Sequence, residues 1–202
     1  GSIGKNLINI IKNNKKDFKI VLLSANKNIK ELEKQANLFN VKNLIDKNKK
    51  NYLKIKSKKK YKKKNLFNNF NNIDNLFKKK IDYVMSSISG IEGLEPTIKI
   101  IKCTKSIAIA NKEAIICGWS IIKKELKRNK TQFIPVDSEH FSIWYGLKNQ
   151  EKNSLEKVFL TASGGPFYKT SLNKFKNIKV SDALKHPNWK MGKKISIDSA
   201  TM

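Results

Sequence analysis

The chain has 202 residues, of which 39% are hydrophobic, and this length and composition fit one or two globular domains. It carries a formal net charge of +27, and it contains no run of about 18 apolar residues that would form a helical membrane span. The first residues lack the pattern of a secretory signal peptide, and Cys103 and Cys117 lack the spacing of metal or redox motifs. We therefore expect a protein with no membrane partner, in a cytoplasmic compartment that keeps thiols reduced.

The strong positive charge first suggests a protein that binds nucleic acid. Nearly all of this charge is Lys, and Arg128 is the only arginine, although Arg is the residue whose planar fork matches phosphates and guanine edges. Lys, Asn and Ile are abundant together, which indicates a bias toward codons rich in A and T. We therefore expect no nucleic-acid partner. The alternative, a basic nucleic-acid-binding protein, would use residues 47–80.

The first half of the chain alternates between helical and strand patterns. Residues 4–16 have apolar side chains at helical spacing, and residues 18–25 form a short apolar run that is typical of a buried strand. Helical spacing returns behind an Asn in residues 28–39. Residues 47–80 are rich in Lys and Asn and are only weakly patterned, so no element is predicted there.

The second half predicts more elements. Residues 82–102 indicate a strand, a glycine-containing turn and a helix. Beyond them we expect helices at 112–128 and 139–148, and strands at 106–111, 132–136, 157–162 and 194–198. Strands that alternate with helices predict an α/β fold: a Rossmann-like, doubly wound, mainly parallel sheet, followed by the start of a second α/β domain.

Four polar motifs follow predicted strands. They are ANKE (residues 110–113), VDSEH (136–140), ASGGPF (162–167) and IDSAT (197–201). In open parallel sheets, ligands bind beyond the carboxyl ends of the strands. We therefore expect a ligand site lined by these four motifs.

The acid pair in VDSEH is the sharpest of these signals. If the chain stays extended through Glu139, the side chains of Asp137 and Glu139 lie on one side of it, with Ser138 opposite. Two carboxylates placed in this way suit a hard divalent cation such as Mg²⁺ or Mn²⁺. The alternative is that Asp137 ends the strand and Glu139 caps the next helix, with His140 as a residue of the helix start.

The other motifs each allow a functional and a structural interpretation. Glycines in residues 1–4 would let the backbone approach a pyrophosphate at a helix N-terminus, or would serve an ordinary helix start. Lys112 would neutralise a phosphate or polarise a carbonyl, or would simply begin a helix. Ser163 and Ser199 would bind phosphate oxygens, or would lie in plain turns. HPNWKMGKK, residues 186–194, would cover a bound substrate, or would be a surface loop with one buried Trp.

In this order and spacing, the motifs GSIG, ANKE, PVDSEH, SGGPF and HPNWKMGKKISIDSATM resemble those of 1-deoxy-D-xylulose 5-phosphate reductoisomerases. The likeness is specific from Asp82 onward. Members of this family use NADPH to make 2-C-methyl-D-erythritol 4-phosphate in the non-mevalonate isoprenoid pathway. The resemblance implies an NADPH-binding domain over residues 1–136 that lacks its first strand. It also implies a catalytic domain over residues 137–202 that is cut short.

The resemblance assigns roles to individual residues. It implies cofactor contacts at Gly1, Ser2, Ile3, Asn26, Lys27, Asn28, Asn111, Glu113 and Gly192, and ligands for Mn²⁺, Mg²⁺ or Co²⁺ at Asp137 and Glu139. It implies substrate contacts at Lys112, Ser138, Glu139, Ser163, His186, Trp189, Met191 and Ser199. Lys112, Glu139 and His186 would act in catalysis. Trp189 and Met191 match the loop that closes over the sugar phosphate, or over a phosphonate inhibitor such as fosmidomycin.

The family's chemistry fits these residue types. In the family, the metal binds the ketone oxygen and a neighbouring hydroxyl oxygen, the carbon chain migrates, and NADPH reduces the resulting aldehyde. A third carboxylate ligand follows the SATM motif in the family, so we expect the chain to be a fragment of such an enzyme. The resemblance also implies that the full-length enzyme is a homodimer. We expect the cytoplasm as its location, or a plastid if the source has one. An NADP-dependent oxidoreductase that does not isomerise its substrate is a further alternative.

Overall fold

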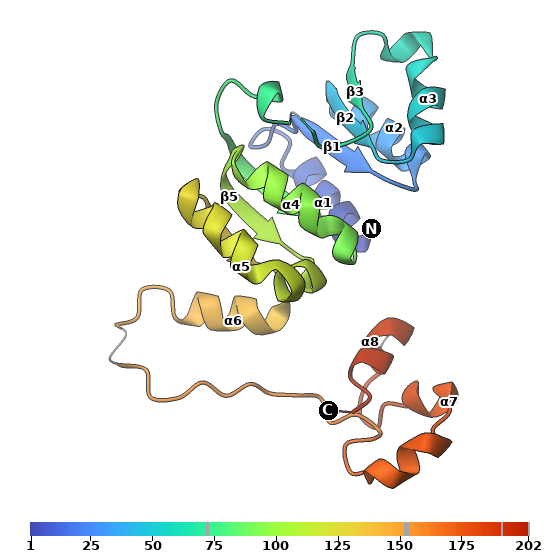
Figure 1. Cartoon of the computed structure of the whole chain (residues 1–202), viewed down its shortest axis with the longest axis vertical. Helices are drawn as coiled ribbons and strands as arrows, with labels where there is room; N and C mark the ends of the chain where they lie inside the picture. Colours follow the sequence, from blue (N-terminus) through green and yellow to red (C-terminus); the bar gives the residue numbers. More distant parts are fainter. Residues whose placement is uncertain (72, 152–153, 191, 202) are drawn as a thin grey trace. The chain divides into compact units, whose positions relative to one another are not determined.

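The computed structural model describes residues 1–71, 73–151, 154–190 and 192–201 (Figure 1). The chain folds into two compact units, Gly1–Gly146 and Leu147–Met202. The boundary between them follows α6 (Ser138–Gly146), whereas the boundary expected from the sequence precedes this helix.

The first unit contains two parallel, three-stranded sheets. One has the order β1-β2-β3, formed by Leu22–Ala25, Asn43–Asp46 and Asn65–Phe67. The other has the order β4-β5-β6, formed by Ile81–Ser86, Thr104–Ile109 and Gln132–Pro135. The predicted α/β fold with parallel strands is confirmed.

Helices connect and flank these strands. They are α1 (Ser2–Asn13), α2 (Ile29–Leu38), α3 (Lys49–Lys56), α4 (Leu94–Ile101), α5 (Lys112–Arg128) and α6, with single-turn 3₁₀ helices η1 (Lys59–Tyr61), η2 (Ile73–Leu76) and η3 (Ile91–Gly93). The starts of three helices are fixed by asparagines. The side chains of Asn28, Asn48 and Asn111 each accept a hydrogen bond from the backbone N–H three residues later, which satisfies a donor that the helix leaves unpaired.

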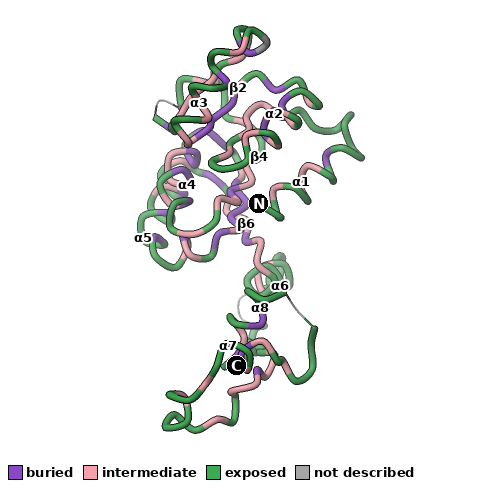
Figure 2. Tube along the Cα trace, turned by 90° about the vertical axis from the view of Figure 1, so that its right-hand side faces the viewer, coloured by how far each residue is buried: buried purple, intermediate pink, exposed green. Residues whose placement is uncertain are grey.

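The core of the first unit joins its two sheets. Ile45 on β2 belongs to the same buried cluster as Ile101, Ile107, Ile109 and Ile122 from the second sheet and its helices. Figure 2 shows buried segments of the trace near the labels β2, α4 and β6. A second cluster lies between the first sheet and helices α2 and α3, and it includes Leu32, Ala36, Val41, Leu44, Ile55 and Tyr61. This shared core fixes the carboxyl ends of β2 and β5 relative to each other.

The Lys- and Asn-rich segment is folded, although its pattern predicted no element. It forms α3, η1, β3 and η2. Several of its lysines hold the fold together: Lys58 pairs with Glu33 at 2.7 Å, and the Lys64 ammonium donates to the carbonyl oxygens of Ala36 (3.2 Å) and Val41 (2.9 Å). Lys64 thereby satisfies a carbonyl in the last turn of α2 and another just beyond that helix. Part of the positive charge is therefore structural.

The second unit has short helices in its described part: η5 (Leu172–Asn177), α7 (Val180–Ala183) and α8 (Lys193–Asp198). The predicted strand at 194–198 is wrong, because this segment is α8. Its Lys194 and Asp198 pair at 2.7 Å across one helical turn.

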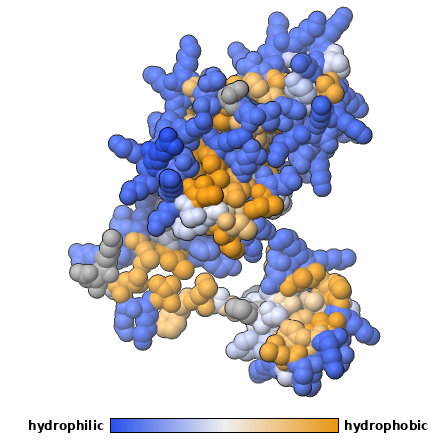
Figure 3. Space-filling model, in the orientation of Figure 1, coloured by the Kyte–Doolittle hydropathy of each residue, from blue (hydrophilic) through white to orange (hydrophobic). Residues whose placement is uncertain are grey.

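The predicted strand at 157–162 is also wrong. Residues 155–165 carry no strand, and no described strand of the chain pairs with them. A strand needs a partner for its backbone hydrogen bonds, and here the apolar pattern has none. Val158, Phe159 and Leu160 are consequently exposed, Phe159 to 82%, and they contribute apolar surface to this extended segment (Figure 3).

Candidate active site

The GSIG turn lies at the carboxyl end of β4. Gly1 caps α1, and a Cβ atom added at Gly4 would come within 3.3 Å of the Ser87 hydroxyl oxygen. A larger side chain at Gly4 would therefore press on the residue that follows β4. The turn combines a close backbone approach with the free N–H groups of a 12-residue helix, an arrangement that suits an anionic group.

The segment Asn26–Asn28 follows β1. Asn28 caps α2 by accepting from the Glu31 N–H at 3.0 Å, and both Asn26 and Lys27 are exposed. The N–H of Lys47, which follows β2, donates to the Ala25 carbonyl at 3.0 Å. The ends of two neighbouring strands are thus tied together beside this exposed turn.

Asn111 fastens the loop that follows β4 to the start of α5. Its side chain is buried, accepts from the Ala114 N–H at 2.9 Å, and donates to the carbonyl oxygens of Ile88 (2.5 Å) and Gly90 (2.6 Å). A Cβ atom at Gly93 would lie 2.3 Å from the Asn111 amide nitrogen, so this loop requires glycine there. Both amide hydrogens of Asn111 are used in these bonds, so its main contribution is to position the loop.

Lys112 and Glu113 occupy the first turn of α5, directly after Asn111. Lys112 is exposed and Glu113 is half-buried. The hydrogen bonds of Asn111 therefore hold both side chains at the carboxyl end of β5, beside the loop that follows β4.

The acid pair lies at a helix start and not on an extended strand. α6 begins at Ser138, and Asp137 caps it by accepting from the His140 N–H at 3.0 Å. The prediction that an extended chain aligns Asp137 with Glu139 is therefore wrong, because the backbone turns between them. Glu139 is exposed and accepts a hydrogen bond from the Ser138 hydroxyl at 3.0 Å.

The environment of Asp137 favours a charged carboxylate. Partial burial, with 18% of the side chain exposed, raises its pKa, but hydrogen bonds from the His140 main chain and ring outweigh this effect and leave the pKa below its ordinary value. Carboxylate oxygens are the donors that Mg²⁺ and Mn²⁺ prefer, so the residue types fit a divalent cation. Within the described ranges, no group of three or more His, Cys, Asp or Glu residues is placed to hold a metal ion.

In the second unit, His186 is held in one orientation. Its Nδ1 atom accepts hydrogen bonds from the N–H groups of Asn188 (3.2 Å) and Trp189 (3.1 Å). The proton of the neutral ring therefore lies on Nε2, which is 3.2 Å from the Ser163 hydroxyl oxygen. Ser163 and His186, which are far apart in the sequence, are thus neighbours in the structure.

The SGGPF turn packs against the segment that contains Ser199. A Cβ atom at Gly165 would lie 1.9 Å from the Ser199 carbonyl oxygen, and the Phe167 N–H donates to the Ala200 carbonyl at 2.8 Å. Gly164 has φ = +69°, a conformation that favours glycine. The two glycines therefore allow the turn to reach Ser199.

The remaining predicted residues of this unit lie near that turn or on α8. Gly164 and Gly165 line a depression of about 530 Å³ together with Lys169, Lys185 and Asn188. Trp189 is exposed, and Gly192 is the N-cap residue of α8. Met191 lies outside the described residues.

The predicted site residues thus form two groups, one in each unit. The first comprises Gly1, Ser2, Ile3, Asn26, Lys27, Asn28, Asn111, Lys112, Glu113, Asp137, Ser138 and Glu139, and the second comprises Ser163, His186, Trp189, Gly192 and Ser199. Ser87 and Gly93 are not among the predicted site residues. Ser87 lies against the GSIG turn, and Gly93 lies against the Asn111 side chain. The glycine-containing turn expected within residues 82–102 was the available signal.

Two sequence models of one family match the chain. The model described as 1-deoxy-D-xylulose 5-phosphate reductoisomerase matches residues 1–118, and the model of that enzyme's C-terminal domain matches residues 133–202. The chain belongs to the 1-deoxy-D-xylulose 5-phosphate reductoisomerase family. The resemblance seen in the motifs is confirmed.

Curated family members align over the whole chain. The 1-deoxy-D-xylulose 5-phosphate reductoisomerase of Pelagibacter ubique is 60% identical over 204 residues, which cover 100% of this chain and 53% of the relative. The enzyme of Wolbachia pipientis from Culex pipiens is 43% identical and is covered to 52%. The chain spans about half the length of the curated relatives that it matches.

Solved family structures share the fold. The Zymomonas mobilis reductoisomerase in complex with NADPH is 29% identical with a TM-score of 0.82, and the alignment covers 99% of this chain and 51% of the other. A reductoisomerase in complex with NADPH, fosmidomycin and magnesium has a TM-score of 0.77 at 29% identity, with 99% and 52% covered. Among the described residues, no helix has the length and apolar character to cross a membrane.

Proposed function

We propose that this chain is part of an enzyme that converts 1-deoxy-D-xylulose 5-phosphate to 2-C-methyl-D-erythritol 4-phosphate with NADPH and Mn²⁺, Mg²⁺ or Co²⁺. The observation that carries this proposal is the match of both family models, in order, to residues 1–118 and 133–202. In this proposal the first unit binds the cofactor and supplies the first metal ligands, and residues 137–202 belong to the catalytic domain.

The cofactor site would use the strand ends of the first unit. Gly1, Ser2 and Ile3 would approach the pyrophosphate, which the close fit of Gly4 against Ser87 supports. Asn26, Lys27 and Asn28 would lie along the adenosine phosphate, Asn111 and Glu113 nearer the nicotinamide, and Gly192 on the covering loop. The cofactor supplies a hydride, so no protein nucleophile is required.

Asp137 and Glu139 would hold the divalent cation through carboxylate oxygens, the donor type that such cations prefer. The cation supplies a Lewis acid that stabilises negative charge on a substrate oxygen. His140 would keep Asp137 ionised through its two hydrogen bonds, and Lys112 and Ser138 would contact the substrate beside the cation.

The second unit would bind the sugar phosphate. His186 would donate from Nε2, the ring nitrogen that carries the proton, while Ser163 and Ser199 would bind phosphate oxygens. Trp189 and Met191 would exclude water from the reacting carbons. Phosphate anchoring positions the reacting end, so binding energy from the far end of the substrate would lower the barrier.

We also propose that the complete enzyme is a homodimer in the cytoplasm, or in a plastid if the source has one. Light scattering of the complete enzyme would give a dimer mass. A monomer mass at micromolar concentration would contradict the dimer.

The proposal can be tested in a chimaera in which residues 1–202 of this chain replace the matching segment of the Pelagibacter ubique protein. This exchange is possible because the alignment covers the whole chain. We expect NADPH oxidation that depends on both Mn²⁺ and 1-deoxy-D-xylulose 5-phosphate, with the branched product identified by NMR. Reduction without a branched product would favour a simple NADP-dependent oxidoreductase.

We expect Asp137→Asn in this chimaera to abolish metal-dependent NADPH oxidation, because one of the two carboxylates is lost. Asp82→Asn is the matched control, since Asp82 is an exposed acid whose ion pair with Lys105 contributes little. The metal assignment is wrong if Asp137→Asn keeps activity close to that of the parent chimaera.

A further inference from the structure

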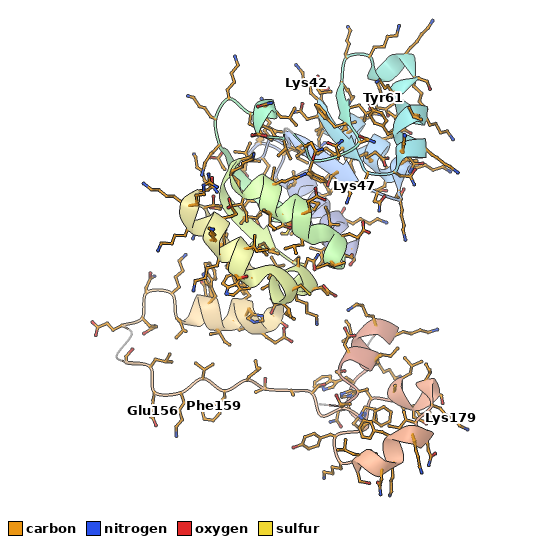
Figure 4. The ribbon with its side chains drawn as sticks, in the orientation of Figure 1. Lys42, Lys47, Tyr61, Glu156, Phe159 and Lys179 are labelled. Carbon is orange, nitrogen blue, oxygen red and sulfur yellow. The ribbon has the colours of Figure 1, made fainter. Side chains whose placement is uncertain are left out.

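Lys47 follows β2 at the edge of the sheet where the proposed cofactor site lies. Its N–H donates to the Ala25 carbonyl at 3.0 Å, and Ala25 directly precedes the exposed segment Asn26–Asn28. This hydrogen bond fixes the backbone of Lys47 beside that segment. Figure 4 labels Lys42 and Lys47, the residues that flank β2 on its amino and carboxyl sides.

The Lys47 side chain points toward the loop that follows β4. Its ammonium nitrogen is 3.7 Å from a carboxylate oxygen of Glu92, in η3. The Lys47 side chain is 26% exposed and that of Glu92 is 66% exposed. Lys47 thus reaches from the end of one sheet to a loop of the other, and that loop is held in place by the hydrogen bonds of Asn111.

This ion pair is long and its acid is mostly solvated, so a stronger anion would displace Glu92 at little cost. A phosphate monoester carries nearly two negative charges and three acceptor oxygens. Asp46, the acid that directly precedes Lys47 at the end of β2, is fully buried. It accepts a hydrogen bond from the Asn48 N–H at 2.9 Å and faces away from solvent. Because the Lys47 backbone adjoins Ala25, an anion bound over Asn26–Asn28 would lie at the same strand ends as Lys47.

We propose that Lys47 is a ligand of the 2′-phosphate of NADPH, and that Glu92 competes with this phosphate for the Lys47 ammonium. Lys47 thereby sets the preference for NADPH over NADH. This inference rests on the proposed function, because it assumes that the dinucleotide lies across the strand ends of the first unit.

The test measures binding of NADPH and of NADH to the chimaera by fluorescence titration, without substrate. We expect Lys47→Gln to weaken NADPH binding roughly tenfold, the usual effect of removing a charged hydrogen bond, and to leave NADH binding unchanged. Glu92→Gln should tighten NADPH binding up to about threefold and leave NADH unchanged, because it removes the competitor. Lys42→Gln, which removes the same charge from the other end of β2, should change neither affinity by more than about twofold.

Equal weakening of NADPH and NADH by Lys47→Gln would overturn the inference, because it would indicate a structural role. An unchanged NADPH affinity in Lys47→Gln would also overturn it. If the parent chimaera binds neither dinucleotide, the proposed function itself fails. Recovery of NADPH affinity in Lys47→Arg would support the role of the charge and would show that position 47 tolerates substitution.

Discussion

The two units position their candidate site residues by different means. In the first unit, the motifs follow strands whose buried Ile side chains form a common core, so the packing of these strands fixes the positions of the motifs. In the second, the described buried side chains are few and small: Ala183, Ser196 and Ala200. There, a side-chain hydrogen bond joins Ser163 to His186. A close glycine contact and a main-chain hydrogen bond hold the SGGPF turn against Ser199 and Ala200. Damage to its core should therefore disrupt the first group as a whole, whereas damage in the second unit should stay local.

A substitution in the core of the first unit tests the first half of this contrast. Ile107 on β5 is fully buried in the core that joins the two sheets. Ile107→Ala should lower the free energy of unfolding of the first unit by about 2–5 kcal/mol, through lost burial and the cavity left behind. Denaturant titration measures it, and the expected signature is a lower midpoint with an unchanged slope.

The matched control is Ile116→Ala on α5. Its side chain is 77% exposed, so the change should stay within about 0.5 kcal/mol. Equal losses in the two variants would show that a tightly packed core does not hold the strand ends, and the contrast between the units would disappear.

The second unit should break locally. Gly165→Ala places a Cβ atom 1.9 Å from the Ser199 carbonyl oxygen, and a main-chain atom cannot move aside as a flexible side chain does. We expect this overpacking to lower the free energy of unfolding by about 1–3 kcal/mol and to separate the SGGPF turn from Ala200. Hydrogen exchange should show lost protection of the Phe167 N–H, with unchanged protection in β5.

Gly192→Ala is the control for this local effect. Gly192 has an ordinary φ of −61°, and an added Cβ atom would meet nothing within 4 Å. Retained protection of Phe167 in Gly165→Ala would mean that the turn does not depend on the close contact with Ser199.

The same contrast explains what the sequence could predict. α5 was predicted from its helical spacing with the bounds that the structure gives, because Asn111 caps it and the sheet fixes its apolar face. The four-residue strand β2 was missed, because Lys and Asn surround too short an apolar run. In the second unit, the alternation of Ile195 and Ile197 suggested a strand, yet the segment is a helix with Ser196 as its buried residue.

The candidate site shows the same limits. That polar motifs gather at strand ends follows from parallel topology, which the alternation of elements revealed. The orientation of Asp137 could not be predicted, because a carboxylate after a strand is equally suited to bind a cation or to cap a helix, and here it caps α6. The hydrogen bond between His186 and Ser163 depends on a fold between distant residues, which no local pattern encodes.

A weaker effect is expected on the pH dependence of stability, and it arises from Asp46 at the carboxyl end of β2. Asp46 is fully buried; burial raises the pKa of its carboxyl group, and the hydrogen bond from the Asn48 N–H only partly opposes this rise. In the unfolded chain the carboxyl keeps its ordinary pKa, so the folded state binds the proton more tightly. As the pH rises from the ordinary pKa to the raised one, the free energy of unfolding should therefore fall. Asp46→Asn should remove this part of the pH dependence while keeping the acceptor for Asn48. Urea titrations of the parent chain and of Asp46→Asn across the acidic pH range measure the difference. Identical pH profiles would show that the Asp46 carboxyl has the same pKa in the folded and unfolded states.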